Sequence, residues 1–221
     1  MSTASLKAPR AAAVAGILFS ALLITSVLLV RISVPADPRE IGAWLSTRAS
    51  TVALALNLVP FSGVAFLWFI GVLRDRLGAR EDRLFATVFL GSGLLFLAML
   101  FLSAAIAGSI LLTYAANPDR LVGSTTFVFA RTLVYEVVNI YAIKMAAVFM
   151  VVTSTLALRT RLFARWLAYV GYAVALALIV SSAYVEWILL VFPLWVLIVS
   201  VYILIDNMWV AWQRARRSGA E

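Results

Sequence analysis

Residues 11–30 read AAAVAGILFSALLITSVLLV, and this run decides the class of fold. It carries no charge, with Lys7 and Arg10 before it and Arg31 directly after it. The hydrocarbon core of a bilayer is ~30 Å thick, and a helix rising 1.5 Å per residue crosses it in about 20 residues. The apolar core of a cleaved signal peptide is shorter, at about 7–15 residues. The run therefore predicts a retained transmembrane helix.

The composition of the whole chain supports this interpretation. Of its 221 residues, 64% are hydrophobic and 13% are charged, and the mean hydropathy is +1.04. Soluble domains are usually about half apolar and about a quarter charged. The chain contains neither cysteine nor histidine, which removes the thiol nucleophile and the commonest haem and zinc ligand. We therefore expect a membrane protein that binds no cofactor or metal and is not an enzyme.

Five further apolar runs follow the first. The sequence predicts spans at about residues 11–30, 51–73, 84–115, 126–158, 166–185 and 187–206. The third and fourth runs exceed 30 residues, so we expect them to tilt or to project beyond the lipid. Backbone polar groups in lipid must be satisfied internally, and long runs without alternation satisfy them as helices. The expected fold is all-α: a single polytopic integral membrane domain over residues 1–221, built as a six-transmembrane-helix bundle.

Basic residues are distributed unevenly along this pattern. If the N-terminus is cytoplasmic, the inner segments hold twelve lysines and arginines and the outer segments hold five. The positive-inside rule then places both termini in the cytoplasm. The net charge of +8 has the same origin, so no nucleic-acid partner is expected. The expected location is the cell membrane, with the lipid bilayer as partner and other membrane subunits or a second copy as further candidates.

The longest loop, residues 31–50, lies on the outer side in this topology. Asp37 followed by Pro38 has the form of an N-cap and a first helical position, which predicts a short extracytoplasmic helix over about residues 38–46. We expect this helix to carry Trp44 at the membrane interface.

Small residues occur at helix-contact spacing within several spans. They are GSG at 91–93, Ala104 with Gly108, and Gly171 with Ala175. Such pairs let helix backbones approach closely, so these positions predict contacts between helices.

The fourth span contains the polar residues of greatest functional interest, in RTLVYEVVNIYAIKMAAVFM at residues 131–150. At 1.5 Å per residue from the inner end of their spans, Lys144 lies at ~21 Å, Asn57 of the second span at ~24 Å, Asn139 at ~28 Å and Glu136 at ~33 Å. A charge at the bilayer centre costs at least ~2.5 kcal/mol and usually faces the bundle or water. The four residues therefore predict a polar pocket in the outer half of the bundle. Alternatively, Lys144 extends its stem to the outer headgroups and lines no pocket.

Pro60 strengthens the interest in Asn57, which lies one turn before it. A proline removes a helical N–H donor, and interrupted helices line many transport and ligand cavities. We therefore expect Asn57 to turn toward the bundle.

A resemblance to a known group rests on the segment LNLVPFSGVAFLWFIGVLRDRLGAREDRLFATVFLGSGLLF at residues 56–96. This segment resembles a group of uncharacterised bacterial multispan membrane proteins. TRLFARWLAYVGY and FPLWVLIVSVYIL resemble the final hairpin of the same group. The resemblance covers most of the chain from the second span onward. It implies an integral membrane protein of about six helices, and it implies no activity and no catalytic residue.

Three functions are compatible with these observations. The first, and the one we expect, is a membrane binding or transport module, in which Lys144 favours a small anionic or carbonyl-bearing ligand. The second is a non-catalytic accessory or scaffold subunit of a larger membrane complex. An intramembrane enzyme acting on lipid is the least favoured, because the chain lacks histidine and cysteine and no two carboxylates share one depth.

Overall fold

A computed structural model of the chain describes residues 7–35, 40, 42–77, 83–160, 163–181 and 187–218. Within these ranges every regular element is a helix. In chain order the helices are α1 (Lys7–Ser33), α2 (Leu45–Leu77), α3 (Arg83–Ala116), α4 (Pro118–Leu121), α5 (Thr125–Glu136), the π-helical η3 (Val137–Ala142), α6 (Ile143–Thr160), α7 (Arg165–Ser181) and α8 (Ile188–Ser218).

Five of the described helical stretches are long and apolar enough to cross a membrane. They are Ala11–Ser33, Leu45–Arg74, Leu84–Ala116, Thr125–Thr160 and Ile188–Trp209. The apolar part of α7, Arg165–Val180, is shorter. Residues 182–186, which would complete the predicted span at 166–185, lie outside the described residues. The prediction of an all-α fold is confirmed, with five helices long and apolar enough to cross a membrane, and the sixth crossing stays a prediction.

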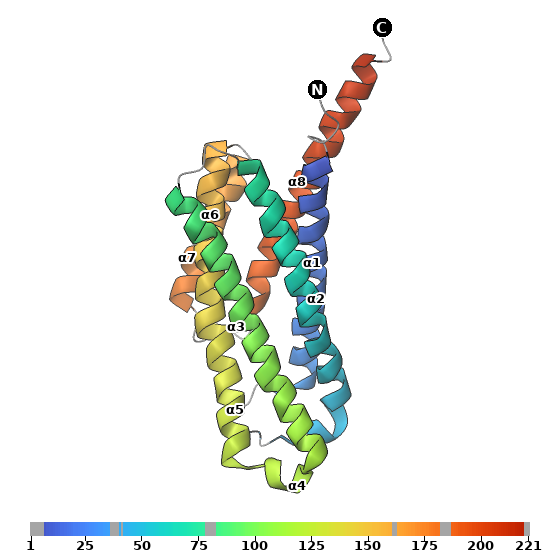
Figure 1. Cartoon of the computed structure of the whole chain (residues 1–221), viewed down its shortest axis with the longest axis vertical. Helices are drawn as coiled ribbons and strands as arrows, with labels where there is room; N and C mark the ends of the chain where they lie inside the picture. Colours follow the sequence, from blue (N-terminus) through green and yellow to red (C-terminus); the bar gives the residue numbers. More distant parts are fainter. Residues whose placement is uncertain are drawn as a thin grey trace.

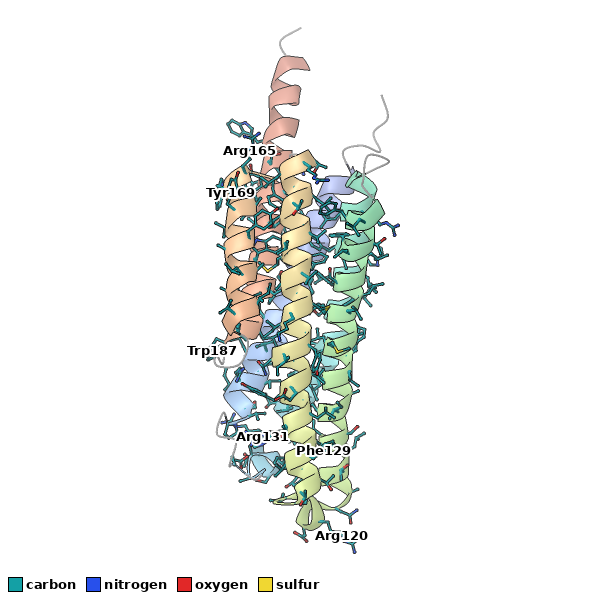
Figure 2. The ribbon with its side chains drawn as sticks, turned by 90° about the vertical axis from the view of Figure 1, so that its left-hand side faces the viewer. Arg120, Phe129, Arg131, Arg165, Tyr169 and Trp187 are labelled. Atoms are coloured by element: carbon teal, nitrogen blue, oxygen red, sulfur yellow. The ribbon has the colours of Figure 1, made fainter. Side chains whose placement is uncertain are left out.

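The helices form an elongated bundle with two distinct ends (Figure 1). At one end, here called the basic end, α1 begins, α2 ends, α3 begins and α6 ends. The other end, here called the far end, carries α4. Helix α7 lies beside α6 in the basic half alone, and α8 runs from the middle of the bundle past the basic end (Figure 1). Arg165 and Tyr169 mark the basic end, and Arg120 and Arg131 lie toward the far end (Figure 2).

Helices α2 and α3 are much longer than α7, and only the two longer helices exceed the thickness of a bilayer core. Helices α2 and α3 have 33 and 34 residues, which corresponds to ~50 Å each, against ~30 Å for the hydrocarbon core. Helix α7 has 17 residues, or ~25 Å. Because α7 starts at the basic end, the far-end parts of α2, α3 and α5 extend beyond the level that α7 reaches.

Aromatic side chains fill the interior toward the basic end. This aromatic core consists of Phe19, Phe66, Phe69, Phe89, Phe96, Phe149 and Phe192, each at most 2% exposed. The rings come from five helices, and the centroids of paired rings lie 4.5 to 6.5 Å apart. Lipid tails are as apolar as these rings, so close packing rather than exclusion of water favours their association.

Serines join the first two helices across the same interior. The Ser26 hydroxyl donates to the carbonyl of Ala55 at 2.7 Å, and the Ser62 hydroxyl donates to the carbonyl of Phe19 at 3.3 Å. Both serines are buried. These bonds satisfy hydroxyls that would otherwise be unpaired in an apolar environment, and they fix α2 against α1.

The predicted contacts at small residues are confirmed at some positions and wrong at others. A Cβ added at Gly93 would lie 2.6 Å from Cδ1 of Ile70, and one added at Gly171 would overlap the Ser154 hydroxyl. Helices therefore meet closely at both glycines. By contrast, a Cβ added at Gly91 or Gly108 meets nothing within 4 Å. These two glycines face open space and make no close contact with another helix.

A second, smaller group of buried residues lies at the far end. This far-end cluster consists of Leu45, Ile110, Leu121 and Phe127. The described part of the predicted helix at 38–46 is not a separate helix. Gly42 has a φ of +106°, which favours glycine and produces a sharp turn, and α2 begins directly after this turn at Leu45. Residues 38, 39 and 41 lie outside the described residues.

Candidate functional site

The helical path that carries Glu136, Asn139 and Lys144 changes its hydrogen-bond pattern at η3. Glu136 is the last residue of α5, Asn139 lies within η3, and Lys144 is the second residue of α6. At the end of η3 the amide of Ile143 bonds to the carbonyl of Val138, five residues earlier. Such π-helical turns are rare and occur frequently at functional sites.

Asn139 is buried within the bundle. It is 5% exposed, and its Nδ2 donates to the carbonyl of Tyr135 at 3.0 Å. This bond runs to a residue on the same helix, four positions earlier. The buried amide donor is therefore satisfied locally rather than by a second span.

Lys144 lies on the outward surface of α6, so the prediction that it faces the bundle is wrong. Asn139 is 5% exposed inside the bundle, whereas the side chain of Lys144 is exposed. Asn139 and Lys144 therefore do not line one pocket. Within the described part of the chain, no ion pair reaches Lys144.

Asn57 is also exposed, and the prediction that it turns inward is wrong. It belongs to an outward stripe on α2, which continues through Leu54, Phe61, Val64 and Trp68 at spacings of three and four residues. Residues at this spacing share one helix face, so Asn57 faces away from the bundle. Helix α2 is assigned as α-helical without interruption at Pro60.

Glu136 is half-buried, and no ion pair joins it to Lys144 among the described residues. Its position three residues before Asn139 places the two on neighbouring faces of the helix. Of the four predicted pocket residues, the structure brings only Glu136 and Asn139 close to one another, and it does so through their proximity in sequence.

The far end instead holds a polar arrangement that the sequence did not reveal. Two Arg131 nitrogens donate to carbonyls of the chain between α1 and α2: Nη1 to Glu40 and Nη2 to Pro35, each at 2.6 Å. Nη1 also lies 3.7 Å from the Glu40 carboxylate. That carboxylate accepts bonds from the backbone amides of Gly42 at 2.9 Å and Ala43 at 2.6 Å.

We call this set of contacts the Arg131 clamp, comprising Arg131, Glu40, Pro35, Gly42 and Ala43. The side chains of Arg131 and Glu40 are 21% and 17% exposed, so both are largely shielded from solvent. The clamp connects α5 to the turn that precedes α2. No local pattern could have predicted it, because the partners lie 91 and 96 residues apart in the chain.

The described residues contain no group of three acidic, histidine or cysteine side chains able to hold a metal ion. No family model, curated protein or solved structure matches the chain.

Proposed function

We propose that this chain is a non-catalytic subunit of a larger membrane assembly and contacts its partner through the outward face that carries Lys144. The observation that supports this most strongly is the exposure of Lys144 at membrane depth. An ammonium ~21 Å from the inner end of a ~30 Å hydrocarbon core is costly when it faces lipid. An acidic side chain on a neighbouring protein offsets that cost through an ion pair.

The partner is expected to present an aspartate or glutamate at the same depth. Side chains on a helix lean toward its N-terminus, which for α6 is the far-end side. The Lys144 side chain can therefore also extend toward the far-end headgroups, and this conformation competes with the ion pair to the partner. The interior offers less support for transport, because the aromatic core is closely packed across five helices.

Crosslinking in the native membrane tests the proposal. Tyr141, 58% exposed and one turn before Lys144, is replaced by a photoreactive phenylalanine analogue. We expect a protein adduct that is lost in Lys144→Met and retained in Lys144→Arg, because only the latter keeps the charge. The matched control is the same analogue at Phe61, which is 66% exposed on the Asn57 stripe.

Two outcomes contradict the proposal. If the purified chain in mild detergent has the mass of a monomer with lipid alone, and Lys144→Met crosslinks like the wild type, Lys144 only snorkels. If the adduct has twice the mass of the chain, the partner is a second copy rather than a different subunit.

The binding or transport function is our second proposal, and the π-helical η3 with buried Asn139 favours it. Its ligand would be small and carbonyl-bearing and would contact Asn139, because Lys144 and Asn57 are reached only from outside the bundle and the Glu136 carboxylate would repel an anion. Asn139→Leu should then remove a co-purifying small molecule from the native mass spectrum. A spectrum without such a molecule in the wild type would count against this function.

We further propose a six-span topology with both termini in the cytoplasm, in the cell membrane of a bacterium and within the multispan group that the chain resembles. Helix α1 begins at the basic end of the bundle, and α8 runs past the same end to its last residue (Figure 1). This supports the placement of both termini on one side of the membrane. A cysteine at Ser218 is unique, because the chain has none of its own. It should react with a membrane-impermeant maleimide only after the membrane is permeabilised. Labelling in intact cells would instead show that the C-terminus lies outside the cytoplasm.

A further inference from the structure

A groove lies on the outward surface between α2 and α3 at the basic end. Its lining residues are Arg74 from α2 and Ala86, Thr87, Leu90, Gly91 and Leu94 from α3. Its volume is ≈ 270 Å³, slightly below the about 300–1,000 Å³ of pockets that enclose a whole small molecule. The groove therefore suits part of a larger ligand.

The lining is polar at one end and apolar along the rest. Arg74 is exposed near the end of α2, and Thr87 is exposed in the second turn of α3. From Ala86 the groove continues to Leu94, eight residues along α3 and hence ~12 Å. Past Thr87 its α3 side is apolar, formed by Leu90, Gly91 and Leu94.

The glycine at position 91 keeps the groove open. A Cβ placed there meets nothing within 4 Å, whereas a Cβ at Gly93, two residues later, would strike Ile70. Gly91 is thus not needed for helix contact, although it lies in the GSG segment that predicted one.

Arg74 differs from Arg159, which lies near Phe85 in the first turn of α3. The guanidinium carbon of Arg159 lies 4.5 Å from the ring centroid of Phe85, in a cation–π contact. Arg159 is thereby directed to an aromatic face of this chain. Arg74 is the arginine that lines the groove, where its planar donors are suited to a phosphate group.

We propose that the groove between α2 and α3 binds one anionic phospholipid, with its phosphate at Arg74 and one acyl chain along Leu90, Gly91 and Leu94. Two features favour a lipid over a free anion. The apolar lining gives no advantage to inorganic phosphate, and Arg74 lies at the basic end, where we expect the helices to reach the headgroup level. Basic pockets between transmembrane helices bind anionic headgroups in this way. This proposal is independent of the function proposed for Lys144.

Native mass spectrometry of the purified full chain tests it. The protein is mixed with equal amounts of dioleoyl phosphatidylglycerol and dioleoyl phosphatidylcholine, which share their chains and differ in net charge. We expect preferential retention of the phosphatidylglycerol adduct, and inorganic phosphate should not displace it. Arg74→Gln should lower the preference about five-fold, in keeping with the contribution of one basic residue near a membrane surface. Arg48→Gln, an exposed arginine near the other end of α2, should leave it unchanged.

A second pair of variants tests the apolar part without altering charge. Gly91→Leu fills the groove and should reduce retention of phosphatidylglycerol. Gly108→Leu is the matched control, since it lies on the same helix, also faces open space, and is ~26 Å further along the axis. Unchanged melting temperatures in detergent would show that both variants fold.

The proposal is overturned if the wild type retains both lipids equally, or if inorganic phosphate displaces the bound lipid. It is also overturned if the Arg74 and Arg48 variants lose lipid to the same extent, or if Gly91→Leu retains it as Gly108→Leu does.

Discussion

The aromatic core and the far end of this protein are held together by different forces. In the aromatic core, seven phenylalanines from five helices pack their rings at centroid distances of 4.5 to 6.5 Å. At the far end, four buried apolar residues form a small cluster beside the Arg131 clamp. Within the described residues, the only ion pair is the one in this clamp.

The difference follows from the surroundings of the two regions. A charged pair within hydrocarbon must offset a large desolvation cost. Dispersion between closely packed side chains has no such cost, so it gives more net stabilisation there. The long helices exceed the ~30 Å hydrocarbon core, and we expect their far-end parts to project beyond it. Charged groups keep part of their hydration there, and an arginine with carbonyl and carboxylate acceptors stabilises a turn that has few apolar contacts.

The largest effect is expected from Phe66→Ala. Phe66 is fully buried, and its ring pairs with five others of the aromatic core. Removal of a buried phenylalanine costs about 3–5 kcal/mol in soluble proteins. We expect about 2–3 kcal/mol here, because the unfolded helices stay in an apolar environment and the transfer contribution is small. The free energy of unfolding in mixed micelles, titrated with sodium dodecyl sulfate, measures it.

Phe61→Ala is the control for that variant, since Phe61 is on the same helix and 66% exposed. It should change the unfolding free energy by less than about 0.5 kcal/mol. Equal effects of the two variants would show that the aromatic core does not dominate the stability of the bundle.

An intermediate effect is expected from Gly16→Ala, which tests close approach rather than ring packing. A Cβ at Gly16 would overlap the Ser200 hydroxyl and lie 2.9 Å from Cδ2 of Phe69, and both neighbours are fully buried. Overpacking of this kind costs about 1–3 kcal/mol. The same micelle titration measures it, with Gly108→Ala as the control. Gly108 faces open space and alanine favours helix, so a loss of stability there would contradict our account.

The smallest effect is expected from Arg131→Gln, and it should be confined to the far end. Loss of the charge-assisted bonds to Glu40 and Pro35 should weaken the turn before α2 by about 1 kcal/mol. Hydrogen exchange of the amides in residues 42–50 should then accelerate about five-fold, while exchange in the aromatic core stays unchanged. Arg131→Lys should not restore protection, because one ammonium cannot replace the planar donors that reach two carbonyls.

The control for the clamp is Arg120→Gln, an exposed arginine at the same end. It should leave the exchange of residues 42–50 as in the wild type. If Arg131→Gln instead destabilised the entire bundle, the two regions would form one cooperative unit and the comparison between them would fail.

Sequence reasoning succeeded where a property depends on local composition. Runs of about 20 or more apolar residues identified the helices, because backbone hydrogen bonding in lipid leaves few alternatives. Asn139 is buried, but its predicted part in a ligand pocket stays a prediction. The reasoning failed for Lys144 and Asn57, whose depth along the helix was used to infer a shared pocket. Depth follows from residue count, whereas the direction of a side chain around the helix depends on which neighbours the helix packs against.

The sequence by itself determined the all-helical class of the protein and the order of its long apolar helices. Only the tertiary structure decided that Gly93 meets Ile70 while Gly91 opens a groove, and that Arg131 joins a turn 91 residues earlier in the chain. The physical reason is that hydrophobicity acts on each segment independently. Contacts depend instead on the rotation and register of helices, which are fixed only when all of them pack together.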